Sequence, residues 1–253
     1  MIQSHTAQPN VIFAYWAKEF SSRLALNDVT HVLDVGCRDG RASYALAKMY
    51  RHLKITAIDR HKDFIERARQ SPEYNHLQDR VQFIHSNYAE MRSQSDFDAV
   101  VSFCCLHWLS AEERLASLKS MHDLVKPGGA LYLQIFLDHG RQRFDDCIYT
   151  VAARDKWQSY FAGMPLDVNK VKLSDTLATM EDLGLLFKSA TTQHYTYTFE
   201  SREAMAAFLA AWCGHLAYLP EGKRKAFLEE AITQHGSLLY RDYVTELVLA
   251  RPS

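Results

Sequence analysis

The chain has 253 residues, of which 47% are apolar, and its 29 basic side chains nearly balance its 30 acidic ones. This profile is typical of one large globular α/β domain and excludes a disordered chain. The net charge of −1 does not favour nucleic acid as a partner, and no run approaches the roughly 20 apolar residues of a membrane span. We therefore expect a cytoplasmic protein that acts on neither nucleic acid nor membranes.

The cysteines are odd in number and scattered along the chain. They form no C-x-x-C pair of the kind that binds zinc or belongs to a disulfide framework. We expect reduced, buried thiols and no metal site at the five positions Cys37, Cys104, Cys105, Cys147 and Cys213.

An amphipathic helix is predicted over residues 9–26, where apolar and aromatic side chains recur at intervals of one, three or four. Short aliphatic runs then alternate with helical segments, a pattern typical of a parallel sheet. A capping box of Ser110 and Glu113 begins the third of these helices, which ends before a turn at 127–129. The predicted strands are 31–35, 54–59, 81–85, 97–103 and 130–137, and the predicted helices are 41–50, 63–70 and 111–124.

The alternation breaks after residue 137. We expect two helices within 138–173, a helix at 174–183, a strand within 186–199, two helices within 201–235 that join near 219–222, and a last strand at 243–250. This order predicts a single domain. Its core spans 27–136, and helical cap insertions occupy 137–173 and 200–239.

A buried strand leads into a tight turn between Gly36 and Gly40. Glycines permit a positive φ and remove the Cβ that would collide with a ligand lying across the strand ends. The dinucleotide template G-x-G-x-x-G fails here, because Arg38 and Arg41 stand where its second and third glycines belong. Asp34 would repel a pyrophosphate but suits a cationic or hydrogen-bond-donating ligand, so a nicotinamide dinucleotide is not expected.

The segment VLDVGCRDG, residues 32–40, resembles the first motif of class I S-adenosylmethionine-dependent methyltransferases, an acidic residue followed by G-x-G-x-G. Arg38 replaces the middle glycine, so its side chain must point away from the cofactor if binding is kept. The resemblance implies a Rossmann-like fold, a seven-stranded mostly parallel sheet with an antiparallel last strand, and S-adenosyl-L-methionine as cofactor. It places Asp34, Gly36, Cys37 and Gly40 against that cofactor.

Asp59 ends the second strand 19 residues after Gly40, the spacing at which an acid accepts hydrogen bonds from ribose hydroxyls. Its alternative interpretation is a surface aspartate. The resemblance also puts Asn87, where the family usually has an aspartate, against the adenine; the alternative is an ordinary polar loop. The remaining predicted cofactor contacts are Arg60, Tyr88, Phe103 and Tyr15.

The segment FDAVVSFCCLHWL, residues 97–109, resembles the fourth motif of the family, which delivers His107 and Trp108 to the transferred methyl group. The alternative for this pair is buried packing. The L-H-W ending is similar to that of small-acid carboxyl methyltransferases, the trans-aconitate and juvenile hormone acid enzymes. Substrate contacts are predicted for Trp16, Arg141 and Arg143, and cap residues Arg154 and Lys156 are further candidates to bind a substrate carboxylate.

We therefore expect an enzyme that transfers a methyl group to a small molecule, with a carboxylate oxygen as the acceptor. A carboxylate is ionised at neutral pH and needs no general base. Two alternatives remain open. One is an N- or phenolic O-methyltransferase in which His107 takes the proton. The other, suggested by Arg38 and Asn87, is a protein that binds S-adenosylmethionine without catalysis.

Overall fold

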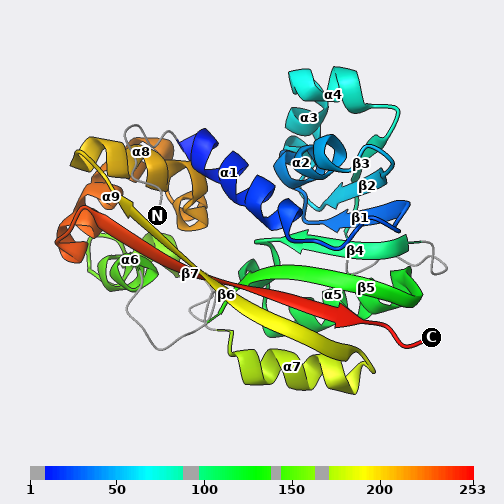
Figure 1. Cartoon of the computed structure of the whole chain (residues 1–253). Coiled ribbons are helices and arrows are strands. Elements are labelled where there is room, and N and C mark those ends of the chain that lie inside the picture. The colour runs from blue at the N-terminus through cyan, green and yellow to red at the C-terminus, as the bar shows by residue number, and fades with distance from the viewer. Residues whose placement is uncertain (1–8, 88–96, 138–143, 163–170) are drawn as a thin grey trace. The chain divides into compact units, whose positions relative to one another are not determined.

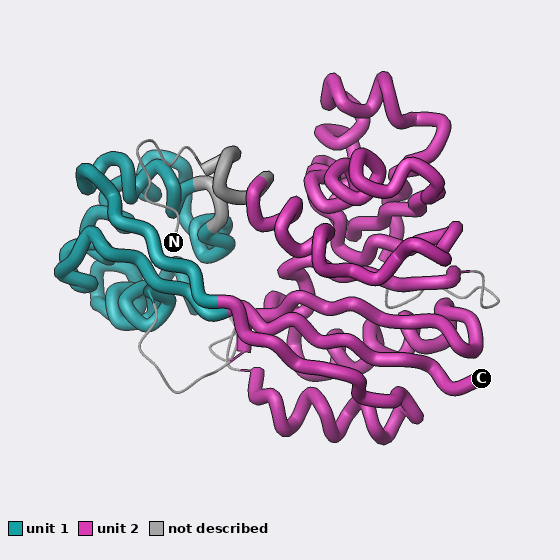
Figure 2. Tube along the Cα trace, viewed as in Figure 1, with its two compact units in different colours: residues 1–13, 139–167, 194–243 teal, residues 14–138, 168–193, 244–253 magenta. Residues whose placement is uncertain are grey.

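The computed structural model describes residues 9–87, 97–137, 144–162 and 171–253. The chain divides into two compact units, drawn in different colours in Figure 2. The first unit contains residues 1–13, 139–167 and 194–243, and the second contains residues 14–138, 168–193 and 244–253. The division into a core and two cap insertions stays a prediction.

One seven-stranded sheet has the strand order β3-β2-β1-β4-β5-β7-β6 (Figure 1). Neighbouring strands from β3 to β5 run parallel, and β7 runs antiparallel to β5. This confirms the predicted mostly parallel sheet with an antiparallel last strand. The strands are β1 (His31–Val35), β2 (Lys54–Asp59), β3 (Val81–His85), β4 (Phe97–Phe103), β5 (Val125–Phe136), β6 (Leu186–Thr198) and β7 (Leu239–Ala250).

Helices of the second unit cover both faces of the sheet. Tyr44 of α2 and Ile65 of α3 are buried with Phe83 on one face, whereas Met121 of α5 and Met180 of α7 are buried on the other. The α-helices are α1 (Pro9–Ser22), α2 (Arg41–Met49), α3 (Lys62–Gln70), α4 (Pro72–Leu77), α5 (Ala111–Leu124), α6 (Phe144–Ala152), α7 (Leu173–Asp182), α8 (Arg202–Trp212) and α9 (Glu221–His235). Three short 3₁₀ helices are η1 (Leu106–Trp108), η2 (Gln158–Phe161) and η3 (Gly214–Tyr218).

The capping box that begins α5 is confirmed. The Ser110 hydroxyl accepts from the Glu113 N–H at 3.2 Å, and the Glu113 carboxylate accepts from the Ser110 N–H at 3.0 Å. These two bonds satisfy N–H groups that the first turn of a helix otherwise leaves unpaired.

The predicted turn at 127–129 was wrong, because these residues lie within β5. Pairing with β4 shifts register here: Phe97 pairs with Val125 and Ala99 pairs with Ala130. Backbone bonds between this segment and Arg251 hold the extra residues in the sheet, including one from Arg251 N–H to the Gly129 carbonyl at 2.9 Å. Pro and Gly therefore mark a bulge rather than a connection.

Candidate active site

The strand order reverses at β1, which pairs with β2 on one side and β4 on the other. In open α/β sheets, ligands bind outside the carboxyl ends of the strands at such a switch point. The predicted site segments begin there. Residues 36–40 follow β1, Arg60 follows β2, and Cys104 follows β4.

The glycine turn after β1 is shaped by contacts within the protein. Gly36 and Gly40 have φ values of 74° and 82°. A Cβ added to Gly36 would lie 2.2 Å from the Sγ atom of Cys105, and one added to Gly40 would lie 2.6 Å from Phe83. Both glycines are thus required by backbone conformation and by close packing of the chain on itself. Cys37, between them, is buried, and burial raises the pKa of its thiol well above the ordinary value.

Arg38 occupies the middle glycine position with a φ of 50°, in the left-handed region. Its guanidinium carbon lies 5.1 Å from the centre of the Phe64 ring on α3. Arg67 contacts the same ring at 4.7 Å. The Arg38 side chain therefore lies on α3 in a cation–π contact. That the cofactor tolerates this arginine stays a prediction.

Asp34 is completely buried on β1. Its Oδ2 accepts from the Ser43 hydroxyl of α2 at 2.6 Å, and its Oδ1 has no hydrogen-bond partner among the described residues. Burial raises the pKa of Asp34 to about 7; the Ser43 bond opposes this shift, and the charge of Asp59 adds to it. An acidic oxygen left unused in the interior fits a cationic or hydrogen-bond-donating group of a ligand. This unused acceptor therefore suits the cationic cofactor S-adenosylmethionine.

Asp59 lies at the carboxyl end of β2, on the same face of the sheet as Asp34. Asp34 pairs in register with Ala57, and Asp59 follows two residues later. One Asp59 oxygen accepts from the Arg38 N–H at 2.9 Å, and the other accepts from the His61 N–H at 2.8 Å. Asp59 thus joins the glycine turn to the turn after β2. Each carboxylate oxygen can still accept one further bond.

Other predicted cofactor residues are more exposed. Arg60 donates from Nη1 to Glu113 of α5 at 2.9 Å, in an ion pair with both side chains partly exposed. Asn87 is exposed just after β3, and Tyr15 of α1 is 36% exposed. Tyr88 lies outside the described residues, as do the predicted substrate residues Arg141 and Arg143.

Aromatic side chains gather around Phe136 at the end of β5. The His107 ring is buried, stands edge-on to Phe136 at 4.6 Å, and accepts from the Phe136 N–H through Nδ1 at 3.5 Å. Trp108, half-buried, lies 5.3 Å from His107, and buried Trp16 lies 6.4 Å from Phe136. Phe103 contacts Phe20 of α1 at 5.7 Å. The structure thus brings together His107, Trp108 and Trp16.

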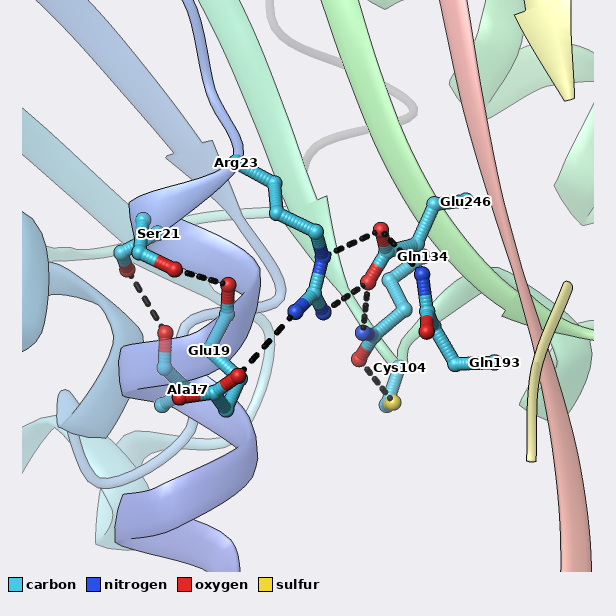
Figure 3. Close-up of polar contacts among 9 residues, drawn as sticks. Ala17, Glu19, Ser21, Arg23, Cys104, Gln134, Gln193 and Glu246 are labelled. Carbon is cyan, nitrogen blue, oxygen red and sulfur yellow. Dashed lines mark hydrogen bonds and ion pairs between the residues drawn. The ribbon is translucent and has the colours of Figure 1, made fainter. Parts of the chain in front are cut away.

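A polar network lies on the face of the sheet that carries Phe136, because Gln134 stands two residues before Phe136 on β5. Figure 3 shows the polar contacts of this network. The Cys104 thiol donates to Gln134 at 3.0 Å, and the Gln134 amide donates to Glu246 at 2.9 Å. Arg23, just beyond α1, donates two bonds to the Glu246 carboxylate, and Gln193 adds a longer one at 3.5 Å. Sequence analysis did not identify this network. Its signal in the sequence is a polar residue within the mostly apolar runs 130–137 and 243–250, Gln134 in the first and Glu246 in the second.

Arg154 and Lys156, the two described cap residues that were candidates to bind a substrate carboxylate, form ion pairs within the first unit. Both pair with Glu230 of α9. The same carboxylate accepts from the Trp157 indole at 2.9 Å. Among the described residues, no group of three or more His, Cys, Asp or Glu side chains is placed to hold a metal ion. None of the described helices is long and apolar enough to span a bilayer.

Comparison with known proteins identifies the family that the central part of the chain resembles. Residues 32–129 match the family model described as a methyltransferase domain. The chain is 28% identical over 120 residues to trans-aconitate 2-methyltransferase of Enterobacter sp. (strain 638), a match that covers 47% of this chain and 44% of that protein. It is 27% identical over 111 residues to tRNA 5-carboxymethoxyuridine methyltransferase of Escherichia coli (strain K12), covering 43% and 41%. The chain thus spans less than half the length of these two relatives.

A solved structure shares the fold over nearly the whole chain. Geranyl diphosphate methyltransferase in complex with SAM superimposes with a TM-score of 0.60 at 12% identity, covering 96% of this chain and 86% of that one. This likeness bears out the expected fold, and the family match over residues 32–129 supports the expected enzyme class and its cofactor. Residues 32–129 therefore match a methyltransferase domain, the class of S-adenosylmethionine-dependent enzyme expected from the sequence.

Proposed function

We propose that this enzyme transfers the methyl group of S-adenosylmethionine to a carboxylate oxygen of a small molecule. The acceptor class is supported by relatives named for acids, the trans-aconitate enzyme and malonyl-[acyl-carrier protein] O-methyltransferase of Priestia megaterium (strain DSM 319 / IMG 1521). The near-neutral charge of the chain supports a small acceptor over nucleic acid.

The observation that carries the cofactor half of the proposal is the pair of buried carboxylates on adjacent strands. Asp34 presents an oxygen with no hydrogen-bond partner in the described protein, and Asp59 keeps capacity to accept from ribose hydroxyls. Gly36 and Gly40 give the turn after β1 its backbone conformation, with φ values of 74° and 82°. When bound, the sulfonium of S-adenosylmethionine supplies an already activated methyl group.

The chain's own task is then to orient the acceptor and to exclude water. His107 and Trp108 border the reacting groups in this proposal, and Phe136 backs them. Because His107 is buried against aromatic rings, it is better placed to line the site and exclude water than to exchange a proton with solvent. A carboxylate acceptor is already ionised and leaves no proton for His107 to take.

A screen with methyl-labelled S-adenosylmethionine tests the proposal. Acids including trans-aconitate, phenols, amines and bulk tRNA are offered in parallel, and labelled products are treated with base. We expect label in an acid, released by base as from an ester. Label that survives base in a phenol or amine would favour the alternative in which His107 is a base, and labelled tRNA would replace the small-molecule proposal.

A His107→Gln variant separates the two roles of this residue. If His107 only borders the reacting groups, the variant should retain most activity on an acid, and its kcat should depend on pH as that of the parent does. As a base it should lose about 100-fold or more on a phenol or amine. Saturable binding of the cofactor without label in any acceptor would favour the non-catalytic alternative.

A further inference from the structure

Asp34 is a buried acid with no basic partner among the residues that the structure describes. Its side chain has no exposed surface, and among the described ion pairs none involves Asp34. Among the described residues, the hydrogen-bond donor to its side chain is the neutral hydroxyl of Ser43. An ionised carboxylate in such surroundings is costly, and the usual response of a protein is to neutralise it with a proton.

The groups facing Asp34 from the neighbouring elements favour that proton. From β2, Asp59 contributes a second negative charge. From the glycine turn, Cys37 contributes a thiol that burial keeps protonated. The neighbours in register on β2 and β4 are Ala57 and Val101, which are apolar. Of the described groups around Asp34, the Ser43 hydroxyl of α2 alone favours the ionised form.

We propose that Asp34 holds a proton on Oδ1 in the ligand-free protein and releases it to solvent when the cationic cofactor binds. Ser43 is a positioning residue that sets the pH at which this exchange occurs. The Oδ1–H bond breaks, the proton passes to buffer, and the remaining carboxylate balances the positive charge of the cofactor. Oδ1 is the site of the proton because Oδ2 already accepts from Ser43. This inference rests on the proposed binding of S-adenosylmethionine.

Isothermal titration calorimetry with S-adenosylmethionine measures the exchanged proton directly. Binding heats are compared in buffers of low and high ionisation enthalpy between about pH 5 and 7, where the amino group of the cofactor stays protonated. We expect release approaching one proton at the acid end, and an affinity that falls by up to about tenfold per pH unit below 7. Binding with no buffer dependence would overturn the proposal.

Two variants assign the proton. Asp34→Asn keeps the shape of the side chain and should remove the buffer-dependent heat from whatever binding remains. Release undiminished in Asp34→Asn would place the proton elsewhere and overturn the proposal. Ser43→Ala removes only the hydroxyl, and it should move the pH midpoint of binding upward by about 0.5 to 1 unit.

Ser117→Ala is the matched control for Ser43→Ala. Ser117 is also buried in a helix, and its hydroxyl donates to the Glu113 backbone carbonyl at 2.6 Å, on the face of the sheet covered by α5. It should leave the midpoint unchanged. If Ser43→Ala weakened cofactor binding equally at every pH, Ser43 would have a structural role, and the claim that it sets the pH of proton release would be wrong.

A measurement without cofactor separates this inference from the proposed function. Because the proton stabilises the folded state, Asp34→Asn should gain melting temperature relative to the parent as pH rises from about 5 to 8. If the melting temperature shows this gain but the protein binds no cofactor, the protonation of Asp34 is supported and the proposed function is contradicted. If the protein binds the cofactor but Asp34→Asn shows no gain in melting temperature, the proposed protonation of Asp34 is wrong and the proposed function is unaffected.

Discussion

The guanidinium of Arg23 lies on the carboxylate of Glu246, joining two residues 223 positions apart. The Glu246 side chain is 10% exposed and that of Arg23 is 31% exposed. Gln134 donates to the same carboxylate, and Cys104 donates to Gln134. One set of bonds thus links β5, β7, the residue after β4 and the segment after α1.

Arg23→Met should destabilise the protein by about 2 to 4 kcal/mol, because it leaves the Glu246 charge buried without a cation. The double variant Arg23→Met with Glu246→Leu should recover part of that loss, since no charge is then left unpaired. Urea unfolding of both variants measures the difference. Lys62→Met, which removes an exposed pair with Glu66, is the control and should change stability by less than about 1 kcal/mol. A double variant as unstable as the sum of its parts would contradict this account.

Arg38 in the left-handed region predicts an unusual preference for glycine. Arg38→Ala keeps the strained φ of 50° and loses the cation–π contact with Phe64, whereas Arg38→Gly loses the contact but relieves the strain. The glycine variant should therefore be more stable than the alanine variant by about 1 kcal/mol. Chemical denaturation of the two tests this, and equal stability would show that the position is unstrained. Cys104, whose φ is also 50°, should show the same order of glycine over alanine.

Gly36→Ala should destabilise the protein more than a glycine substitution that is strained by φ alone. The added Cβ meets Cys105 Sγ at 2.2 Å, whereas at Gly184, where φ is 75°, nothing lies within 4 Å. We expect Gly184→Ala to cost about 1 to 2 kcal/mol and Gly36→Ala to cost at least about 2 kcal/mol more. Thermal unfolding compares them. Adding Cys105→Gly should recover only the part of the lost stability that comes from the clash with Cys105. Recovery of the full loss would mean that backbone strain at residue 36 contributes nothing.

The strands that lead to the site could be predicted because their information is local. β1, β2, β3 and β4 have the predicted bounds, since each is a short aliphatic run between polar or glycine-containing segments. α4 was missed because its six residues hold too few apolar positions to show a period. The bulge in β5 was missed because local turn residues were overridden by pairing with Arg251, which no local pattern reports.

The same distinction holds within the site. Asp34 is the penultimate residue of β1 and Asp59 is the last residue of the adjacent β2, so topology alone brings them to one edge. Ser43 could not be predicted as a partner of Asp34, because a serine within a helix is more often solvent-exposed. The bond between Arg23 and Glu246 depends on where the last strand inserts, which only the complete sheet decides.

Asp98, at the opposite end of β4, predicts a pH dependence of stability. Burial alone would raise its pKa, but bonds from Lys126, the His31 N–H and both the N–H and hydroxyl of Thr30 outweigh burial and hold that pKa well below its usual range. A depressed folded-state pKa stabilises the protein fully above the unfolded value of about 4, and this contribution is lost as pH falls further. Asp98→Asn should therefore be less stable by about 2 to 3 kcal/mol at pH 7. Urea unfolding should show the difference in free energy of unfolding between parent and Asp98→Asn narrowing steadily below about pH 4. The exposed control Asp28→Asn should show no such difference at about pH 7 or below about pH 4. A difference that stayed constant down to about pH 2 would mean that the bonds do not depend on the charge of Asp98.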